Sequence, residues 1–404
     1  MHFPQGCISE ALHRNEEIME FRDLKQQYRV LQAEMDKAVS GVMASGAFIM
    51  GPQVRQLEQE LADYVGVKHC LTCANGTDAL TLALKVWGIG PGDAVFVPDF
   101  TFFSSAEVAA LEGATPVFVD VCEDTFNMDP EDLERAIRRT LDEGKLIPKV
   151  VVAVDLFGLP ADYPRIREVA DRFGLWILED GAQGFGGSIC HRGDICHPER
   201  SEGSKACSFG DISTTSFFPA KPLGCYGDGG AVFTDNDEWA ELIASYRVHG
   251  KGSDKYDNVR IGLNSRLDTL QAAILQVKFQ AFKEYELDAV NAAAARYTSL
   301  LCHSESIAPP VIPSGFTSSW AQYTIRLKDR QTRDALQAAL KAAGIPSMVY
   351  YPKPMHLQTA FAPCHSDCPV ATSLCDRVLS LPMHPYISEE DIALVARTIQ
   401  EALK

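Results

Sequence analysis

Short, uninterrupted apolar runs alternate with helical stretches through the middle of the chain. Five of these runs span residues 69–74, 94–98, 115–120, 150–155 and 175–180. Their apolar residues are continuous rather than alternating with polar ones, which is typical of strands buried on both faces. The pattern therefore predicts an α/β fold with a mostly parallel sheet covered by helices.

The second half of the chain adds shorter strands and a smaller unit. A long helix is predicted from about Leu267 to Tyr297, and three prolines interrupt the segment that follows it. A last helix is predicted to start at Ser388, with Asp391 three residues further on as in a capping box. Further strands are predicted at 206–211, 214–218, 230–234, 322–327 and 346–351, and a further helix at 333–343. We expect a large domain over residues 19–290 and a small C-terminal α/β domain over residues 291–404.

Composition narrows the class of protein. The 404 residues are 46% hydrophobic and 23% charged, as in ordinary globular proteins, and the formal net charge is -17. That charge argues against nucleic acid or an anionic membrane as the main partner, because both require a basic surface. No apolar run approaches the roughly 20 residues of a membrane span. We expect a cytoplasmic protein with a loose N-terminal extension at residues 1–18 and a surface insertion at residues 189–205.

The twelve cysteines contain two arrangements that resemble parts of metal sites. Cys70 and Cys73 have the spacing of half a zinc site or of a redox pair, but their flanks predict a buried strand. A second group lies in the insertion and consists of Cys190, His191, Cys196 and His197. We predict no metal site, and the sequence leaves open whether the second group binds a metal.

Lys221 stands in the most informative segment of the chain. Apolar residues and prolines surround it, and four glycines follow within nine positions. Burial lowers the pKa of a lysine, so its amine becomes a nucleophile toward a carbonyl group. This is what pyridoxal 5′-phosphate (PLP) requires of the lysine that holds it. Taken alone, the segment is equally compatible with a surface lysine that lies over apolar neighbours.

Other residues supply the remaining parts of a PLP site. Gly76 and Thr77 lie in a turn before a predicted helix, where backbone N–H groups favour a phosphate, and Ser216 is placed to complete that cradle. Asp180 ends a buried strand and is a candidate partner for the pyridine nitrogen, which a carboxylate keeps protonated. Gln183, three residues further on, is a candidate partner for the phenolic oxygen.

An aromatic side chain is needed to stack on the planar ring of the cofactor. Phe102 is the candidate, with its neighbours Phe100 and Phe103 as alternatives, and at least two of the three belong to the core. The order along the chain supports the hypothesis: a phosphate turn, an aromatic residue, a strand-end aspartate, and a serine five residues before a lysine.

Several runs resemble the motifs of the DegT/DnrJ/EryC1/StrS nucleotide-sugar aminotransferases. They are Cys73–Leu80, Glu179–Gln183, Ser216–Gly224, Asn264–Leu275 and Ser380–Glu390, and the likeness extends from about Met19 to the end of the chain. The resemblance implies the aspartate aminotransferase-like fold (fold type I), PLP as cofactor, Lys221 as the catalytic lysine, and a homodimer with shared active sites. It also implies that Asn264 reaches the cofactor phosphate of the neighbouring subunit.

Within this family the chain is most similar to enzymes that act on UDP-2-acetamido-2-deoxy-3-oxo-glucuronate. The runs Lys221–Gly230 and Asn264–Arg266 carry that finer likeness. It implies transfer of an amino group from L-glutamate to a UDP-linked keto-sugar, for precursors of surface polysaccharide. Two features depart from the relatives: the insertion, and Tyr350 at a position where they tend to carry histidine. Candidates for contacts with the sugar or its diphosphate are Arg247, His249, Arg260, Tyr350 and Tyr351.

Other functions remain alternatives at this point. A TDP-3-keto-6-deoxyhexose and a UDP-4-keto sugar are alternative acceptors, and the sequence does not say which carbon is aminated. A non-catalytic PLP-binding regulator is a further alternative. Sugar dehydration on the same fold is disfavoured because its enzymes replace the lysine by histidine. Cysteine desulfuration is disfavoured because the loop that carries Cys225 is short.

Overall fold

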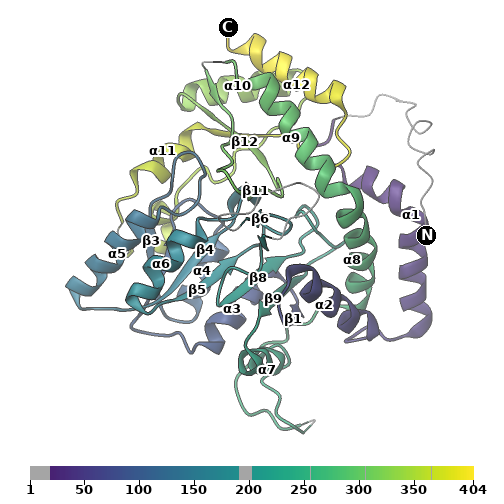
Figure 1. The fold of residues 1–404 in the computed structure, drawn as a ribbon, viewed down its shortest axis with the longest axis vertical. Coiled ribbons are helices and arrows are strands. Elements are labelled where there is room, and N and C mark those ends of the chain that lie inside the picture. Colours follow the sequence, from purple (N-terminus) through teal and green to yellow (C-terminus); the bar gives the residue numbers. More distant parts are fainter. Residues whose placement is uncertain (1–18, 191–202, 255, 305, 365) are drawn as a thin grey trace.

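A seven-stranded sheet forms the centre of the molecule (Figure 1). The computed structural model describes residues 19–190, 203–254, 256–304, 306–364 and 366–404. The strands run in the order β1-β9-β8-β5-β4-β2-β3. All neighbours from β8 to β3 are parallel, whereas β9 is antiparallel to both β1 and β8. The strands are β1 (His69–Cys73), β2 (Asp93–Pro98), β3 (Thr115–Val119), β4 (Ile147–Val154), β5 (Trp176–Asp180), β8 (Ile212–Ser216) and β9 (Gly230–Thr234).

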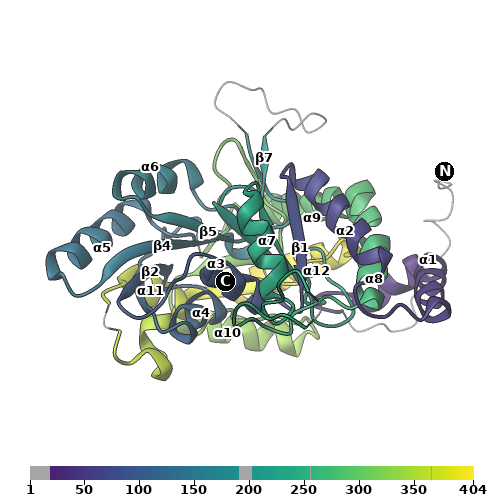
Figure 2. The same cartoon turned by 90° about the horizontal axis from the view of Figure 1, so that it is seen from below.

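Helices cover both faces of this sheet, as Figure 2 shows for α5 and α6 on one side and α3 and α4 on the other. Strand β4 illustrates why: Val150, Val152 and Val154 enter one apolar core, while Val151 and Ala153 enter a second core on the opposite face. The prediction of doubly buried parallel strands is confirmed for β2, β3, β4 and β5, whereas β1 is an edge strand antiparallel to β9. The helices of this part are α1 (Leu24–Ser45), α2 (Pro52–Val65), α3 (Gly76–Val86), α4 (Ser104–Leu111), α5 (Pro130–Glu143), α6 (Tyr163–Phe173), α7 (Asp237–Tyr246) and α8 (Thr269–Ala281).

The C-terminal part has an apolar core of its own. A three-stranded sheet in the order β10-β12-β13 packs there against helices. The elements are β10 (Ile307–Ala308), β12 (Tyr323–Leu327), β13 (Val378–Leu381), α9 (Leu287–Leu301), α10 (Arg330–Ala342), α11 (Pro369–Arg377) and α12 (Glu389–Ala402). The Ser388 hydroxyl accepts a hydrogen bond from the Asp391 backbone N–H at 3.1 Å, so the predicted cap of the last helix is confirmed. This core supports our proposal that the domains divide near residue 290, although α11 packs its buried Ala371, Leu374 and Cys375 into the core of the central sheet.

A third, small sheet flanks the insertion. Strands β6 (Ser188–Ile189) and β7 (Ser204–Lys205) pair with each other, and β6 also pairs with β11 (Phe316–Thr317). The expected extension at residues 1–18 and the residues His191, Cys196 and His197 lie outside the described part of the chain. No helix within that described part is long and apolar enough to cross a membrane.

Two predicted strands are wrong, and five strands were not predicted: β13 and the two-residue strands β6, β7, β10 and β11. Residues 206–211 form turns because the buried Glu179 carboxylate accepts hydrogen bonds from the backbone N–H groups of Cys207 and Phe209, in place of a neighbouring strand. Residues 346–351 form no strand either, and Tyr351 there adopts a φ of 62° that bends the chain. The partner of β12 is instead β13.

The predicted long helix is divided. A π-helical turn at Phe282–Glu286 separates α8 from α9. In this turn Glu286, which is 2% exposed, accepts hydrogen bonds from the side chains of Gln27 and Tyr386. The N-terminal helix α1 lies alongside α8 (Figure 1).

Candidate active site

Lys221 lies in a tight loop between β8 and β9. Its backbone N–H donates to the Phe218 carbonyl at 2.9 Å, and the Cys225 N–H donates to the Phe217 carbonyl at 2.7 Å. A Cβ atom at Gly224 would lie 2.5 Å from the Phe218 carbonyl oxygen, so only glycine fits there without a shift of the backbone. The loop therefore holds the base of the lysine side chain in one place.

The charge balance around Lys221 favours a neutral amine. Burial lowers the pKa of the Lys221 ammonium, the carboxylate of Asp180 opposes that shift, and the guanidinium of Arg22 adds to it. A lowered pKa leaves a larger share of the amine unprotonated near neutral pH and thus nucleophilic. This direction agrees with the prediction made from the residues around Lys221.

Asp180 ends β5 beneath the same loop. It is 5% exposed, and its carboxylate accepts hydrogen bonds from the Ser105 hydroxyl at 2.7 Å and the Ala182 N–H at 3.2 Å. Burial raises the pKa of Asp180, and the Ser105 hydrogen bond and the charge of Lys221 oppose that shift. Both hydrogen bonds come from neutral donors, so the carboxylate can still accept a proton-bearing nitrogen of a ligand.

The predicted phosphate turn meets Ser216 in space. Asn75 caps α3 by accepting from the Asp78 N–H at 2.8 Å, which leaves the first N–H groups of the 11-residue helix available. A Cβ atom at Gly76 would lie 2.8 Å from the Cβ of Ser216, so the two segments touch. The Thr77 hydroxyl shares a hydrogen bond of 2.8 Å with Ser104. The donor set and the helix terminus suit an anion such as a phosphate.

Gln183 is held between two partners. Its side-chain oxygen accepts from the Phe157 N–H at 2.7 Å, and its side-chain nitrogen donates to the Tyr351 hydroxyl at 2.8 Å. Burial raises the pKa of Tyr351, so this phenol stays protonated. The sequence suggested Gln183 and Tyr351 for cofactor and substrate separately, and the structure brings them together.

Among the aromatic candidates, Phe102 differs from its neighbours. Its ring is 55% exposed, whereas Phe100 is 1% exposed and makes an edge contact with Tyr351 at 5.7 Å between centroids. Phe103 packs against Phe361 at 5.1 Å. Phe100 and Phe103 thus belong to the core, and Phe102 is the ring that is free to cover a planar ligand.

The cationic candidates for substrate binding have partners within the chain. Arg247 is 6% exposed, and its guanidinium lies 2.6 Å from the Glu58 carboxylate and 2.7 Å from the Thr72 carbonyl oxygen. Arg260 donates to the Ser245 hydroxyl at 2.7 Å. These contacts are those of structural residues, so a substrate role for either stays a prediction.

Three further candidates lie toward the surface or the domain junction. His249 is exposed in the segment after α7, where its φ is 59°. Asn264 is also exposed and accepts a hydrogen bond from the Arg266 guanidinium. Tyr350 is partly buried, with its ring 6.2 Å from that of Phe21.

Ser105 and Arg22 were not found from the sequence. Ser105 lies in the first turn of α4, and only the adjacency of this helix to the end of β5 brings it to Asp180. Arg22 donates a hydrogen bond to the carbonyl of Lys221 at 2.8 Å across 199 residues of sequence. Neither contact has a local signal in the chain.

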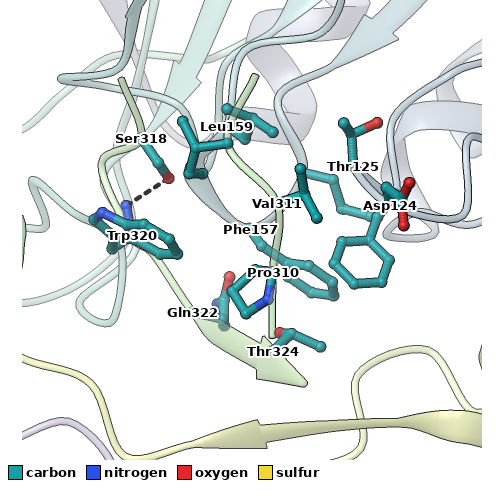
Figure 3. Close-up of a pocket in the computed structure, with 13 residues that line it drawn as sticks. Asp124, Thr125, Phe157, Leu159, Pro310, Val311, Ser318, Trp320, Gln322 and Thr324 are labelled. Atoms are coloured by element: carbon teal, nitrogen blue, oxygen red, sulfur yellow. Dashed lines mark hydrogen bonds between the residues drawn. The ribbon is translucent and has the colours of Figure 1, made fainter. Parts of the chain in front are cut away.

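Figure 3 shows a small hollow beside Phe157, the residue whose backbone N–H binds Gln183. Phe157 and Gln322 are part of its wall, and the Trp320 N–H donates there to the Ser318 hydroxyl at 3.1 Å. Its volume of about 20 Å³ gives room for a single water molecule. Neither Lys221 nor Asp180 lines it, so we do not assign a substrate to it.

Two groups of residues contain side chains that could bind a metal, but the structure assigns a metal to neither. Cys70 and Cys73 face opposite sides of β1, because their side chains enter different cores. Asp99, His356 and Cys368 do lie together. There the His356 Nδ1 already lies 2.6 Å from the Asp99 carboxylate, as a hydrogen bond between segments distant in sequence. We assign no ion to either group.

Known proteins resemble the chain over nearly its whole length. The profile of the DegT/DnrJ/EryC1/StrS aminotransferase family matches residues 29–400. A UDP-2-acetamido-2-deoxy-3-oxo-D-glucuronate aminotransferase of Pseudomonas aeruginosa is 42% identical over 383 residues, which cover 95% of this chain and 99% of that protein. A UDP-N-acetyl-3-dehydro-alpha-D-glucosamine 3-aminotransferase of Acidithiobacillus ferrooxidans is 41% identical and covers 94% and 97%.

Solved structures agree with these relatives. A DegT DnrJ EryC1 StrS aminotransferase from Brucella abortus superposes with a TM-score of 0.89 at 48% identity and covers 95% of this chain and 99% of that one. The PLP form of a putative sugar aminotransferase from Streptococcus pneumoniae superposes with a TM-score of 0.81 at 27% identity, covering 92% and 96%. These likenesses confirm fold type I and indicate dependence on PLP. The chain belongs to the DegT/DnrJ/EryC1/StrS aminotransferase family.

Proposed function

We propose that this protein is a PLP-dependent aminotransferase that moves the amino group of L-glutamate to UDP-2-acetamido-2-deoxy-3-oxo-glucuronate, for a precursor of surface polysaccharide. The observation that carries the reaction type is the position of Lys221. Its amine has a lowered pKa and lies close enough to Asp180 for the two charges to interact, next to the cradle of Gly76 and Ser216. The acceptor follows from the two relatives above, whose names give UDP-linked sugars oxidised at carbon 3.

The residues present fit PLP. Gly76, Thr77 and Ser216 would hold the phosphate, Asp180 the pyridine nitrogen, Gln183 the phenolic oxygen, and Phe102 one face of the ring. Two observations support this assignment: the close approach of Gly76 to Ser216, and a buried Asp180 carboxylate whose hydrogen bonds come from neutral groups. When bound, PLP supplies a carbonyl for the amino groups and an electron sink for the carbon that loses its proton.

The side chains of the chain do the remaining work. The Lys221 amine takes the proton from the α-carbon of the donor and, in the second half of the reaction, returns a proton to the sugar carbon. Asp180 keeps the pyridine nitrogen protonated, which Ser105 assists by fixing the carboxylate. Gln183 is oriented from both ends by Phe157 and Tyr351, so its amide is ready before a ligand arrives.

A homodimer with shared sites is part of the proposal. Exposed apolar side chains surround the segment that leads to Asn264: Val259 is 53% exposed and Ile261 is 88% exposed. Phe48 and Ile49 are 42% and 51% exposed, and they pair with the backbone at Thr269 and Asp268 close by. Exposed apolar side chains of this kind suit a protein interface. Asn264, which is also exposed, would reach the phosphate of the partner's cofactor.

We also place the enzyme in the cytoplasm. Nine of the described cysteines carry free thiols, which is typical of a reducing compartment. Cys302, which is exposed, should react in intact cells with a membrane-permeant maleimide and stay unmodified with an impermeant one. Its modification by the impermeant reagent would contradict a cytoplasmic location.

The test is amination by the purified holoprotein. With L-glutamate and the 3-oxo-glucuronate derivative, the wild type should release 2-oxoglutarate and an amino sugar nucleotide in equal amounts. Lys221→Ala should abolish turnover and keep the fold, while Lys205→Ala, a change of another partly buried lysine outside the site, should keep turnover. A fully active Lys221→Ala variant would refute the mechanism. Activity confined to a 4-keto or TDP-linked sugar would correct the acceptor alone.

A further inference from the structure

We propose that Arg22 binds the carboxylate group that the amino donor and the acceptor sugar both carry, an inference that rests on the proposed function. Arg22 precedes α1, far from Lys221 in sequence, yet it touches the lysine loop. One guanidinium nitrogen donates to the Lys221 carbonyl at 2.8 Å and lies 3.5 Å from the Pro222 carbonyl. The cation is thereby fixed at the residue that performs the chemistry.

Arg22 is a partly buried cation without an anionic partner. No carboxylate in the described part of the chain lies within ion-pair distance of its guanidinium, and burial lowers the pKa of Arg22 although Glu286 and Tyr350 oppose that shift. A cation that is shielded from water and unpaired is costly unless a ligand neutralises it. Arg247 differs in this respect, because the Glu58 carboxylate neutralises it. Arg260 has neutral partners, the Ser245 hydroxyl and the Tyr246 ring, and these hold it away from the lysine loop.

Arg22 lies beside Lys221 but is not among the residues that we assign to the cofactor. Its guanidinium lowers the pKa of Lys221, whereas the carboxylate of Asp180 raises it. Tyr350, from the C-terminal part of the chain, lies close to Arg22 as well. Because Arg22 is held against the backbone of Lys221, a substrate that reaches this lysine comes close to the guanidinium.

Both proposed substrates carry a carboxylate that the Arg22 guanidinium can bind. L-glutamate carries carboxylates, and the glucuronate derivative carries one at carbon 6. In a two-half transamination they take turns at the same lysine, so one cation beside Lys221 serves both. Arginine suits the role because its planar fork binds a carboxylate through two parallel hydrogen bonds.

The experiment compares two acceptors that differ only in charge. Wild type, Arg22→Met, Arg22→Lys and the control Arg29→Met, which changes an exposed arginine on α1, are assayed as holoenzymes. The acceptors are the 3-oxo-glucuronate derivative and its neutral 3-oxo-glucosamine counterpart. The preference is the ratio of kcat/KM for the acidic sugar to kcat/KM for the neutral one. We expect this ratio to fall at least tenfold in Arg22→Met and by a smaller factor in Arg22→Lys. The half-saturating L-glutamate concentration should rise at least tenfold in Arg22→Met.

The preference between acceptors separates substrate binding from a structural role. If Arg22 merely anchored the lysine loop, its loss would lower turnover of both sugars equally and leave their ratio unchanged. The assignment is overturned if Arg22→Met keeps the wild-type preference, or if the wild type has no preference for the acidic sugar. It is also overturned if the half-saturating L-glutamate concentration of Arg22→Met changes less than threefold. A wild type that releases no 2-oxoglutarate from L-glutamate with any sugar refutes the proposed function itself. Circular dichroism and the PLP content of each variant report whether it is folded.

Discussion

Lys278 offers a quantitative test of how the burial of a lysine lowers its pKa and the stability of the protein. This lysine of α8 is 2% exposed, and its ammonium lies 5.0 Å from the ring centroid of Tyr226. Burial lowers its pKa to about 8, with a further contribution from Arg22 that Glu286 opposes. The perturbation is Lys278→Met, which keeps a long unbranched side chain and removes the charge.

The expected magnitude follows from the pKa difference. The folded state holds the Lys278 proton with a pKa of about 8, whereas the reference value is 10.5. At pH 7 that difference of about 2.5 units costs the wild type about 3 kcal/mol of folding free energy relative to a neutral side chain. Between pH 8 and 10.5 the unfolded chain binds more protons than the folded one, so wild-type stability rises with pH in that window. We expect Lys278→Met to be about 1–3 kcal/mol more stable at pH 7.

The assay is urea unfolding followed by circular dichroism at several pH values between 7 and 10, at one protein concentration and with saturating PLP. The advantage of Lys278→Met should shrink as pH rises. Lys283→Met is the matched control, because Lys283 is exposed and also lies over an aromatic ring, that of Phe279. It should change stability by less than about 0.5 kcal/mol. A Lys278→Met variant that is less stable than wild type at pH 7, or an advantage independent of pH, would show that the reasoning is wrong.

Three further predictions concern acid stability, the buried ion pair and the phosphate cradle. Burial lowers the pKa of His384 to about 4. The stability that the neutral imidazole contributes is therefore complete above about pH 6.5 and is lost as pH falls toward 4. His384→Gln should flatten this part of a profile of stability against pH, and an unchanged profile would contradict the assignment. Arg247→Met leaves the partly buried Glu58 carboxylate with its hydrogen bonds from Thr72 but without its cation, and we expect it to cost about 3 kcal/mol at most in urea unfolding. A loss of substrate affinity without a loss of stability would instead favour a substrate role. Gly76→Ala places a Cβ atom 2.8 Å from that of Ser216 and should weaken PLP binding at least tenfold in an absorbance titration. Gly41→Ala is its control, because a Cβ atom at Gly41 meets nothing within 4 Å, and equal PLP affinity in both variants would count against the cradle.

The sequence predicted those features that depend on local pattern. Continuous apolar runs predicted doubly buried strands because every residue of a strand such as β4 enters one of two cores. The strand-end position of Asp180 followed from the same runs, whereas the segment around Lys221 left a buried and a surface lysine equally possible. The structure then added their mutual interaction and the approach of Gly76 to Ser216.

Other features depend on contacts that are distant in sequence and left no local signal. The turns at residues 206–211 follow from the Glu179 carboxylate, which lies on a different strand and accepts their backbone hydrogen bonds. The contact of Ser105 with Asp180 requires α4 to lie above the end of β5. The contact of Arg22 with the Lys221 carbonyl requires the N-terminal segment to return to the β8–β9 loop. No periodicity or motif carries this information.

The most direct test of the account is chemical identification of the lysine that holds PLP. Reduction of the holoprotein with borohydride fixes the cofactor covalently to that lysine, and peptide mapping by mass spectrometry then locates it. We predict a single modified residue, Lys221. Burial also lowers the pKa values of Lys205 and Lys278, so they are the natural rivals. Modification of either rival with an unmodified Lys221 would contradict the central claim.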